Sequence, residues 1–190
     1  MNYWDRTAAT TDPVFEKWVG DTSNPVKRHI FDMIMHHGYR RIIDVGAGPC
    51  TIAQLADELE YAIEYWPIDQ TQFFLQRVED IGLTKFGFGD AADENSWPDD
   101  AGDVAVLRHV LEHNDHWPEI VAKALGHARH VIINLFGYTE GPTEYKRQFE
   151  DLPNNLIGFQ DFASFGTTGN CIIARKRIHG EWIIELSRKG

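Results

Sequence analysis

The segment RIIDVGAGPCT, residues 41–51, joins an apolar strand-like run to a glycine-rich turn and then to the first residue of a helical pattern. Gly46 and Gly48 allow the backbone to turn sharply and allow a ligand to lie against it. The helical pattern continues to residue 61, with apolar side chains three or four positions apart. A strand, a turn and a helix in this order are typical of an α/β sheet. A dinucleotide-binding turn would have a third glycine at position 51, where this chain has Thr51.

Strand-like and helix-like segments alternate on both sides of this turn. Strands are expected at residues 41–45, 63–69, 85–89, 103–108 and 130–136, and helices at residues 25–37, 51–61, 72–81 and 118–127. Two further strands, residues 171–178 and 181–186, flank a tight turn. The pattern predicts a doubly wound α/β fold with a mostly parallel, seven-stranded sheet and an antiparallel C-terminal β-hairpin. In such sheets, ligands bind at the carboxyl ends of the parallel strands.

The chain of 190 residues is expected to form a single domain of four parts. Residues 1–24 form an aromatic N-terminal extension that could act as a lid, and residues 25–136 form a cofactor-binding core. Residues 137–169 have no regular pattern and are expected to be a substrate loop, because long irregular segments in compact domains are often functional. Residues 170–190 form the hairpin. The aromatic side chains that could line an acceptor pocket in the loop are Tyr138, Tyr145, Phe149, Phe159, Phe162 and Phe165.

Composition limits the partners of the protein. Lys and Arg total 18 against 29 Asp and Glu, which gives a net charge of −11 and disfavours a nucleic-acid partner. No apolar run approaches the roughly 20 residues that span a bilayer, and two cysteines are too few for a disulfide framework. The expected protein is therefore cytoplasmic and acts on a small molecule. The composition does not predict an oligomeric state.

Acidic residues stand where the next two strands end. Asp69 ends the second strand, where a carboxylate can accept hydrogen bonds from both hydroxyl groups of a ribose. Asp90 follows the third strand, where it can accept from the exocyclic amine of an adenine while the N–H of Ala91 faces a ring nitrogen. Alternatively, Asp69 is a solvated turn residue and Asp90 a helix cap. Because parallel strands end at one edge of a sheet, both residues are expected to lie beside the glycine turn.

The sequence after the fourth strand makes the pattern specific. Residues 103–113 read DVAVLRHVLEH. Together with the DVGAG turn at residues 44–48, Asp69 and the GDA step at residues 89–91, this sequence resembles the class I S-adenosylmethionine-dependent methyltransferases, which have a Rossmann-like fold. Cys50 departs from the resemblance, since most members have a third glycine there. A small packing side chain fits that position, and a nucleophilic role does not follow from it.

The resemblance implies S-adenosylmethionine as the cofactor and S-adenosylhomocysteine as the product. The methyl group would pass in line from the sulfonium to a hydroxyl, amine or carbon atom of a small-molecule acceptor. Because the cofactor is already activated, the protein mainly supplies proximity, orientation and exclusion of water. The residues expected to bind the cofactor are Asp44, Gly46, Ala47, Gly48, Asp69, Gln70, Asp90, Ala91 and Arg108.

Three residues after the fourth strand are candidates for catalysis, namely His109, Glu112 and His113. If a helix begins there, their spacing puts them on one face of it. The favoured role is that of a general base or a substrate-orienting group. A divalent metal site is the second interpretation, since some relatives hold a metal with Glu-x-x-Glu-His at a similar place, but this chain has His109 where they have the first Glu. A structural polar network is the third.

Two other functional classes remain open. A nicotinamide-dependent oxidoreductase would use the same fold, although Thr51 and the lack of a Tyr-Lys or Ser-Tyr pair near the turn count against it. A non-catalytic cofactor-binding or scaffold protein is the other alternative, because fold alone does not fix function.

Overall fold

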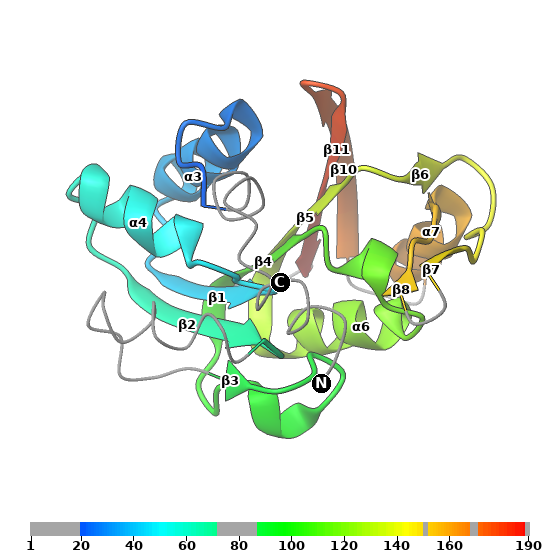
Figure 1. Ribbon diagram of the computed structural model, residues 1–190. Helices are drawn as coiled ribbons and strands as arrows, with labels where there is room; N and C mark the ends of the chain where they lie inside the picture. The colour runs from blue at the N-terminus through cyan, green and yellow to red at the C-terminus, as the bar shows by residue number, and fades with distance from the viewer. Residues whose placement is uncertain (1–19, 72–86, 150–151, 168–170, 189–190) are drawn as a thin grey trace.

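A seven-stranded sheet forms the centre of the computed structural model, which describes residues 20–71, 87–149, 152–167 and 171–188. The strand order is β10-β11-β5-β4-β1-β2-β3 (Figure 1). The strands from β5 to β3 are parallel, whereas β11 runs antiparallel to β5 and to β10. The bounds are β1 Arg41–Val45, β2 Glu64–Asp69, β3 Gly87–Phe88, β4 Gly102–Arg108, β5 Ala128–Leu135, β10 Cys171–Ile178 and β11 Glu181–Arg188.

Helices cover both faces of the sheet, as a doubly wound fold requires (Figure 1). On one face, α3 (Pro25–His37) and α4 (Thr51–Glu58) pack over alternate strand residues such as Ile42. On the other face, α6 (Trp117–His127) packs over Ile43. Because both faces are buried, the central strands are almost continuously apolar. None of the helices in the described part of the chain has the length and hydropathy of a membrane-spanning segment.

The predicted bounds of the core elements lie close to the observed ones. The helix from Pro25 ends at His37 as expected: Asn24 accepts hydrogen bonds at its start, and Gly38 closes it at φ 72°. The helix expected over 51–61 ends at Glu58, and the strand expected over 130–136 begins two residues earlier at Ala128. The expected helix 72–81 and most of the N-terminal extension lie outside the described residues.

Residues 137–169 are not the patternless loop that the sequence predicted. Short strands β6 (Tyr138–Thr139), β7 (Arg147–Phe149), β8 (Leu152–Pro153) and β9 (Ile157–Gly158) are followed by helix α7 (Phe159–Thr167). The ring of Phe162 is fully buried and lies 5.0 Å from that of Trp117 on α6. The prediction was wrong because this segment is ordered by contacts with distant elements, which a local pattern does not reveal.

We expect Phe162→Ala to lower the free energy of unfolding by about 3–5 kcal/mol, since it removes a buried ring and leaves a cavity against Trp117. Chemical denaturation followed by circular dichroism measures the change. Gln160→Ala is the control, because Gln160 is exposed on the same helix and its truncation should change stability by less than about 0.5 kcal/mol. Equal effects of the two substitutions would show that α7 does not contribute to the core.

Candidate functional site

The carboxyl ends of β1, β2 and β3 converge at one edge of the sheet. The N–H groups of Gly46 and Ala47 donate to the carbonyl oxygen of Ile68 at 2.8 and 3.2 Å. The N–H of Gly89 donates to the carbonyl oxygen of Asp69 at 3.1 Å. These bonds join the residues that follow three successive strands, so the structure brings the glycine turn and the two acidic positions together as the sequence predicted.

The turn after β1 needs glycine for two reasons. Gly46 and Gly48 have φ angles of 66° and 51°, which L side chains rarely adopt. A Cβ on Gly46 would also lie 2.4 Å from Cγ2 of Val110, in the segment that follows β4. Cys50, the last residue of the turn, is buried, and this burial raises its pKa to about 12. Its thiol therefore stays protonated at neutral pH, in agreement with a packing role.

Asp69 joins the end of β2 to the glycine turn. Its Oδ2 accepts a hydrogen bond from the N–H of Gly48 at 2.8 Å, and its Oδ1 accepts one from the N–H of Thr71 at 2.8 Å. These two bonds, one to each oxygen, orient the carboxylate relative to the turn. Gln70 is exposed beside it.

Asp90 lies at the same edge after β3. Its Oδ1 accepts a hydrogen bond from the N–H of Ala92 at 2.9 Å, which makes a local turn. The carbonyl oxygen of the neighbouring Ala91 accepts from the indole of Trp97 at 2.9 Å. Asp90 is exposed and Ala91 is buried. The exposed carboxylate therefore lies next to a backbone segment that the hydrogen bond from Trp97 holds in place.

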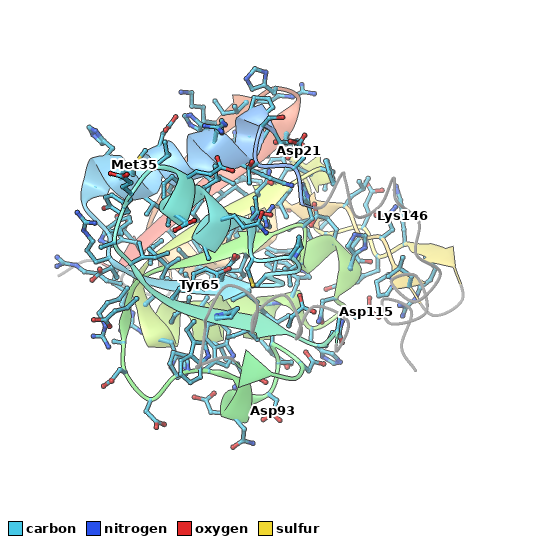
Figure 2. All side chains as sticks on the ribbon, turned by 60° about the vertical axis from the view of Figure 1, so that its left-hand side comes forward. Asp21, Met35, Tyr65, Asp93, Asp115 and Lys146 are labelled. Carbon is cyan, nitrogen blue, oxygen red and sulfur yellow. The ribbon has the colours of Figure 1, made fainter. Side chains whose placement is uncertain are left out.

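Asp44 lies behind the turn, inside the protein. Oη of Tyr65 donates to its Oδ2 at 2.6 Å, and among the described residues nothing hydrogen-bonds to its buried Oδ1. Burial raises the pKa of Asp44, while the charge of Arg108 and the Tyr65 hydrogen bond act in the opposite direction. Arg108 ends β4, and its buried Nε also has no hydrogen-bond partner in the described part of the chain. Figure 2 shows Tyr65 toward the middle of the molecule.

The ring of His109 lies between two carboxylates. Its Nδ1 is 3.6 Å from Oε1 of Glu112, and its Nε2 is 3.2 Å from Oε2 of Glu181. Burial lowers the pKa of His109, but the nearby carboxylates of Glu112 and Glu181 outweigh this effect and raise the pKa above its ordinary value. One face of the ring stacks on Phe136, with centroids 3.5 Å apart. An imidazole held in this way favours the protonated form and is poorly suited to accept a proton.

Both carboxylates are fixed by further hydrogen bonds. The N–H of Phe136 donates to Oε1 of Glu112 at 2.6 Å, and the amide of Asn134 donates to Oε2 of Glu181 at 2.8 Å. Although burial raises the pKa of Glu181, the hydrogen bonds from His109 and Asn134 outweigh it and lower the pKa overall. Glu181 therefore stays ionised and ties the start of β11 to the residue after β4.

His109, Glu112 and His113 do not share a helix face. The expected helix is only the 3-10 turn η3 (Leu111–His113), and His109 precedes it with φ 52°. Nδ1 of His113 lies 2.9 Å from the carbonyl oxygen of Pro153, away from the two-carboxylate arrangement around His109. No group of three or more His, Cys, Asp or Glu side chains within the described ranges could hold a metal ion.

Glu181 and Asn134 are functional candidates that the sequence did not reveal. Glu181 is the first residue of β11, which pairs antiparallel with β5 so that Ile183 lies opposite Asn134. Only this register brings Glu181 to a residue 72 positions earlier in the chain, His109. A charged residue next to a hairpin turn is common, so no local signal distinguished it.

Comparisons with known proteins identify the fold. No protein-family model and no curated protein matches the sequence. A chain from the complex between a Haloferax volcanii methyltransferase activator and a methyltransferase has a TM-score of 0.75 and 10% identity, over 100% of this chain and 99% of that one. This chain has a methyltransferase fold.

Two Burkholderia thailandensis structures agree with the methyltransferase fold. The 1,6-didemethyltoxoflavin-N1-methyltransferase has a TM-score of 0.68 and 13% identity, over 100% of this chain and 91% of that one. An O-methyltransferase family protein has a TM-score of 0.65 and 14% identity, over 95% of this chain and 61% of that one, so this chain spans about three fifths of its length. At these identities the likeness concerns the fold.

We expect Glu181→Gln to lower the pKa of His109 and to reduce stability near pH 6 by about 1.5–3 kcal/mol, the usual contribution of a hydrogen bond between charged groups. Because the folded-state pKa of His109 is raised above 6.5, its ion pairs stabilise the fold fully below that pH and are lost as the pH rises through the folded-state value. NMR titration of His109 and unfolding measured against pH test both effects.

Glu185→Gln is the matched control, since it removes the same charge from β11 four residues further along. It should leave the His109 titration unchanged. If Glu181→Gln also leaves it unchanged, the carboxylate of Glu181 does not control the protonation of His109.

Proposed function

We propose that this protein is an S-adenosylmethionine-dependent methyltransferase that acts on a small-molecule acceptor in the cytoplasm. The observation that carries the proposal is the hydrogen bond from the N–H of Gly48 to the carboxylate of Asp69, which holds an acidic group against a glycine turn at the carboxyl edge of a methyltransferase fold. The solved N1-methyltransferase of similar fold contains its substrate and S-adenosylhomocysteine.

The residues at this edge fit the cofactor. Gly46 and Gly48 have backbone angles that other residues rarely adopt, and Asp69 places a carboxylate, oriented by two N–H groups, where it would accept from a ribose. Asp90 and Ala91 would contact the adenine. The remaining residues assigned to the cofactor are Asp44, Ala47, Gln70 and Arg108. When bound, the cofactor supplies an activated methyl group that is transferred in line to the acceptor.

His113 is the better candidate for a general base, and His109 is a substrate-orienting or structural residue. A carbonyl oxygen can only accept, so the contact with Pro153 assigns the proton of a neutral His113 to Nδ1 and the lone pair to Nε2. Both nitrogens of His109 instead face carboxylates. Glu112 would act through His109, because its Oε1 lies 3.6 Å from Nδ1 of His109. The same oxygen accepts a hydrogen bond from the N–H of Phe136, which fixes its position. A base is needed only for acceptors such as hydroxyl groups that must lose a proton.

We expect calorimetric titration to detect binding of S-adenosylmethionine and S-adenosylhomocysteine but not of NAD. Asp69→Ala should weaken binding by about 1.5–3 kcal/mol, because it removes hydrogen bonds to a charged acceptor. Asp57→Ala is the control, since Asp57 is an exposed acidic residue on α4. Thermal unfolding of each variant separates loss of binding from loss of the turn that Asp69 stabilises.

Three results would contradict the proposal. If neither sulfur nucleotide binds the wild-type protein, it is not an S-adenosylmethionine-dependent enzyme. If NAD binds in their place, the oxidoreductase alternative is favoured. Binding without turnover of any acceptor in a broad screen would favour a non-catalytic cofactor-binding protein.

For a hydroxyl acceptor identified by such a screen, His113→Ala should lower kcat by about 100-fold or more while the affinity for the cofactor changes little, as removal of a general base predicts. His109→Gln should lower kcat less than His113→Ala, because His109 is not the proposed base. A parallel loss of cofactor affinity in His113→Ala would instead assign His113 to the cofactor site or to the fold.

A further inference from the structure

Three aromatic rings surround a cation beside the end of β5. The aromatic cage consists of Tyr138 on β6, Phe159 at the start of α7 and Trp182 on β11. The ring of Tyr138 lies 4.9 Å from that of Trp182 and 6.2 Å from that of Phe159. Figure 1 shows β6 and α7 close together on the side of the molecule next to the hairpin of β10 and β11.

The guanidinium of Arg175, from β10, occupies this cage. Its Cζ lies 4.1 Å from the ring centroid of Phe159, 5.7 Å from that of Trp182 and 5.9 Å from that of Tyr138. All three distances are within the range of cation–π attraction. Nη1 also donates to Oη of Tyr138 at 3.0 Å and contacts both carboxylate oxygens of Glu140 at 2.9 Å.

The cage can be reached from solvent. The side chain of Arg175 is 34% exposed and that of Glu140 is 68% exposed. Ion pairs with this much exposure contribute little to stability, so the guanidinium can leave at small cost. Burial raises the pKa of Tyr138, which therefore remains a neutral phenol with an intact electron-rich face.

The cage lies close in the chain to the residues around His109. Tyr138 is two residues beyond Phe136, whose ring stacks on His109. Trp182 follows Glu181 on β11, so its side chain lies on the other face of the sheet from the carboxylate that contacts His109. Phe136 is itself 47% exposed.

We propose that the aromatic cage and Glu140 bind a substituted ammonium group of the methyl acceptor, and that Arg175 occupies the same position in the absence of the acceptor. This inference rests on the proposed methyltransferase function. A methylated ammonium is weakly hydrated and presents methyl groups to all three rings, whereas a primary ammonium would exchange more water for the same contacts. Such a group has no lone pair, so another atom of the acceptor receives the methyl group and the ammonium serves to position it.

The test uses tetramethylammonium chloride as the probe at constant ionic strength. Its affinity is measured from the shift of the Trp182 indole N–H resonance, which is assigned by its loss in Trp182→Leu. Removal of the internal competitor in Arg175→Ala should increase the affinity for tetramethylammonium at least fivefold over that of the wild-type protein. The double variant with Trp182→Leu should lose this gain when binding is followed by calorimetry.

Lys176→Ala is the control, because Lys176 follows Arg175 on β10 and pairs with Ile183, so its exposed side chain lies on the other face of the hairpin from the cage. It removes the same charge and should leave the affinity unchanged. Uncharged tert-butanol, which has a similar shape, should bind Arg175→Ala no better than it binds the wild-type protein. If Arg175→Ala does not fold, Arg175→Gln removes the cation while keeping most of the side-chain length.

The proposal is overturned if Arg175→Ala binds the probe no better than Lys176→Ala, or if tert-butanol binds as well as tetramethylammonium. S-adenosylmethionine binding is measured on the same samples. Cofactor binding without probe binding rejects the cage and leaves the methyltransferase function in place. Probe binding without cofactor binding rejects the methyltransferase function and, with it, the assignment of the cage to a methyl acceptor.

Discussion

The carboxylate of Asp69 holds together the edge on which the proposed chemistry depends. Parallel strands bring their ends to one side of a sheet, but they do not fix the loops that follow. Here one oxygen of Asp69 accepts from the turn after β1 and the other from the segment after β2, while its own carbonyl oxygen accepts from Gly89 after β3. A single residue therefore orients three loops, and the same residue is the one that we propose to bind the ribose of the cofactor.

A second constraint acts at the other end of the same edge. His109 adopts a backbone conformation that is uncommon for a non-glycine residue, and its ring lies between Glu112 and Glu181. Two carboxylates so close to each other would repel, and the protonated imidazole between them relieves this repulsion. The hairpin is thus fastened to the end of β4 by charge as well as by the pairing of β11 with β5. This arrangement explains why a histidine that looks like a base in the sequence is better suited to organise its surroundings.

The sequence predicted the parts of the structure that depend on local pattern. Strands β1, β4 and β5 are short apolar runs because both faces of the sheet are covered, and Gly46 and Asp69 occupy fixed places relative to the strand ends. What the sequence did not predict depends on pairing between distant residues. Helix α7 is ordered by the contact of Phe162 with Trp117, and Glu181 reaches His109 only through the register of β11 on β5. The prediction that a helix begins after β4 was also wrong, because the positive φ of His109 is not a helical conformation.

The charges at this edge favour a cationic cofactor and a cationic acceptor in the proposed reaction. The carboxylates of Asp69, Glu112 and Glu181 lie along this edge, where those of Glu112 and Glu181 raise the pKa of His109, and the aromatic cage with Glu140 already holds a guanidinium. A sulfonium loses its charge when the methyl group leaves, so a negative environment favours the cofactor over its neutral thioether product. The same environment attracts an ammonium-bearing acceptor, and it does so without contact with the reacting atom. In the proposed reaction, binding of the acceptor's ammonium group and loss of charge at sulfur are therefore separate demands. Different residues would meet them, namely those at the strand ends for the cofactor and those of the hairpin and α7 for the acceptor.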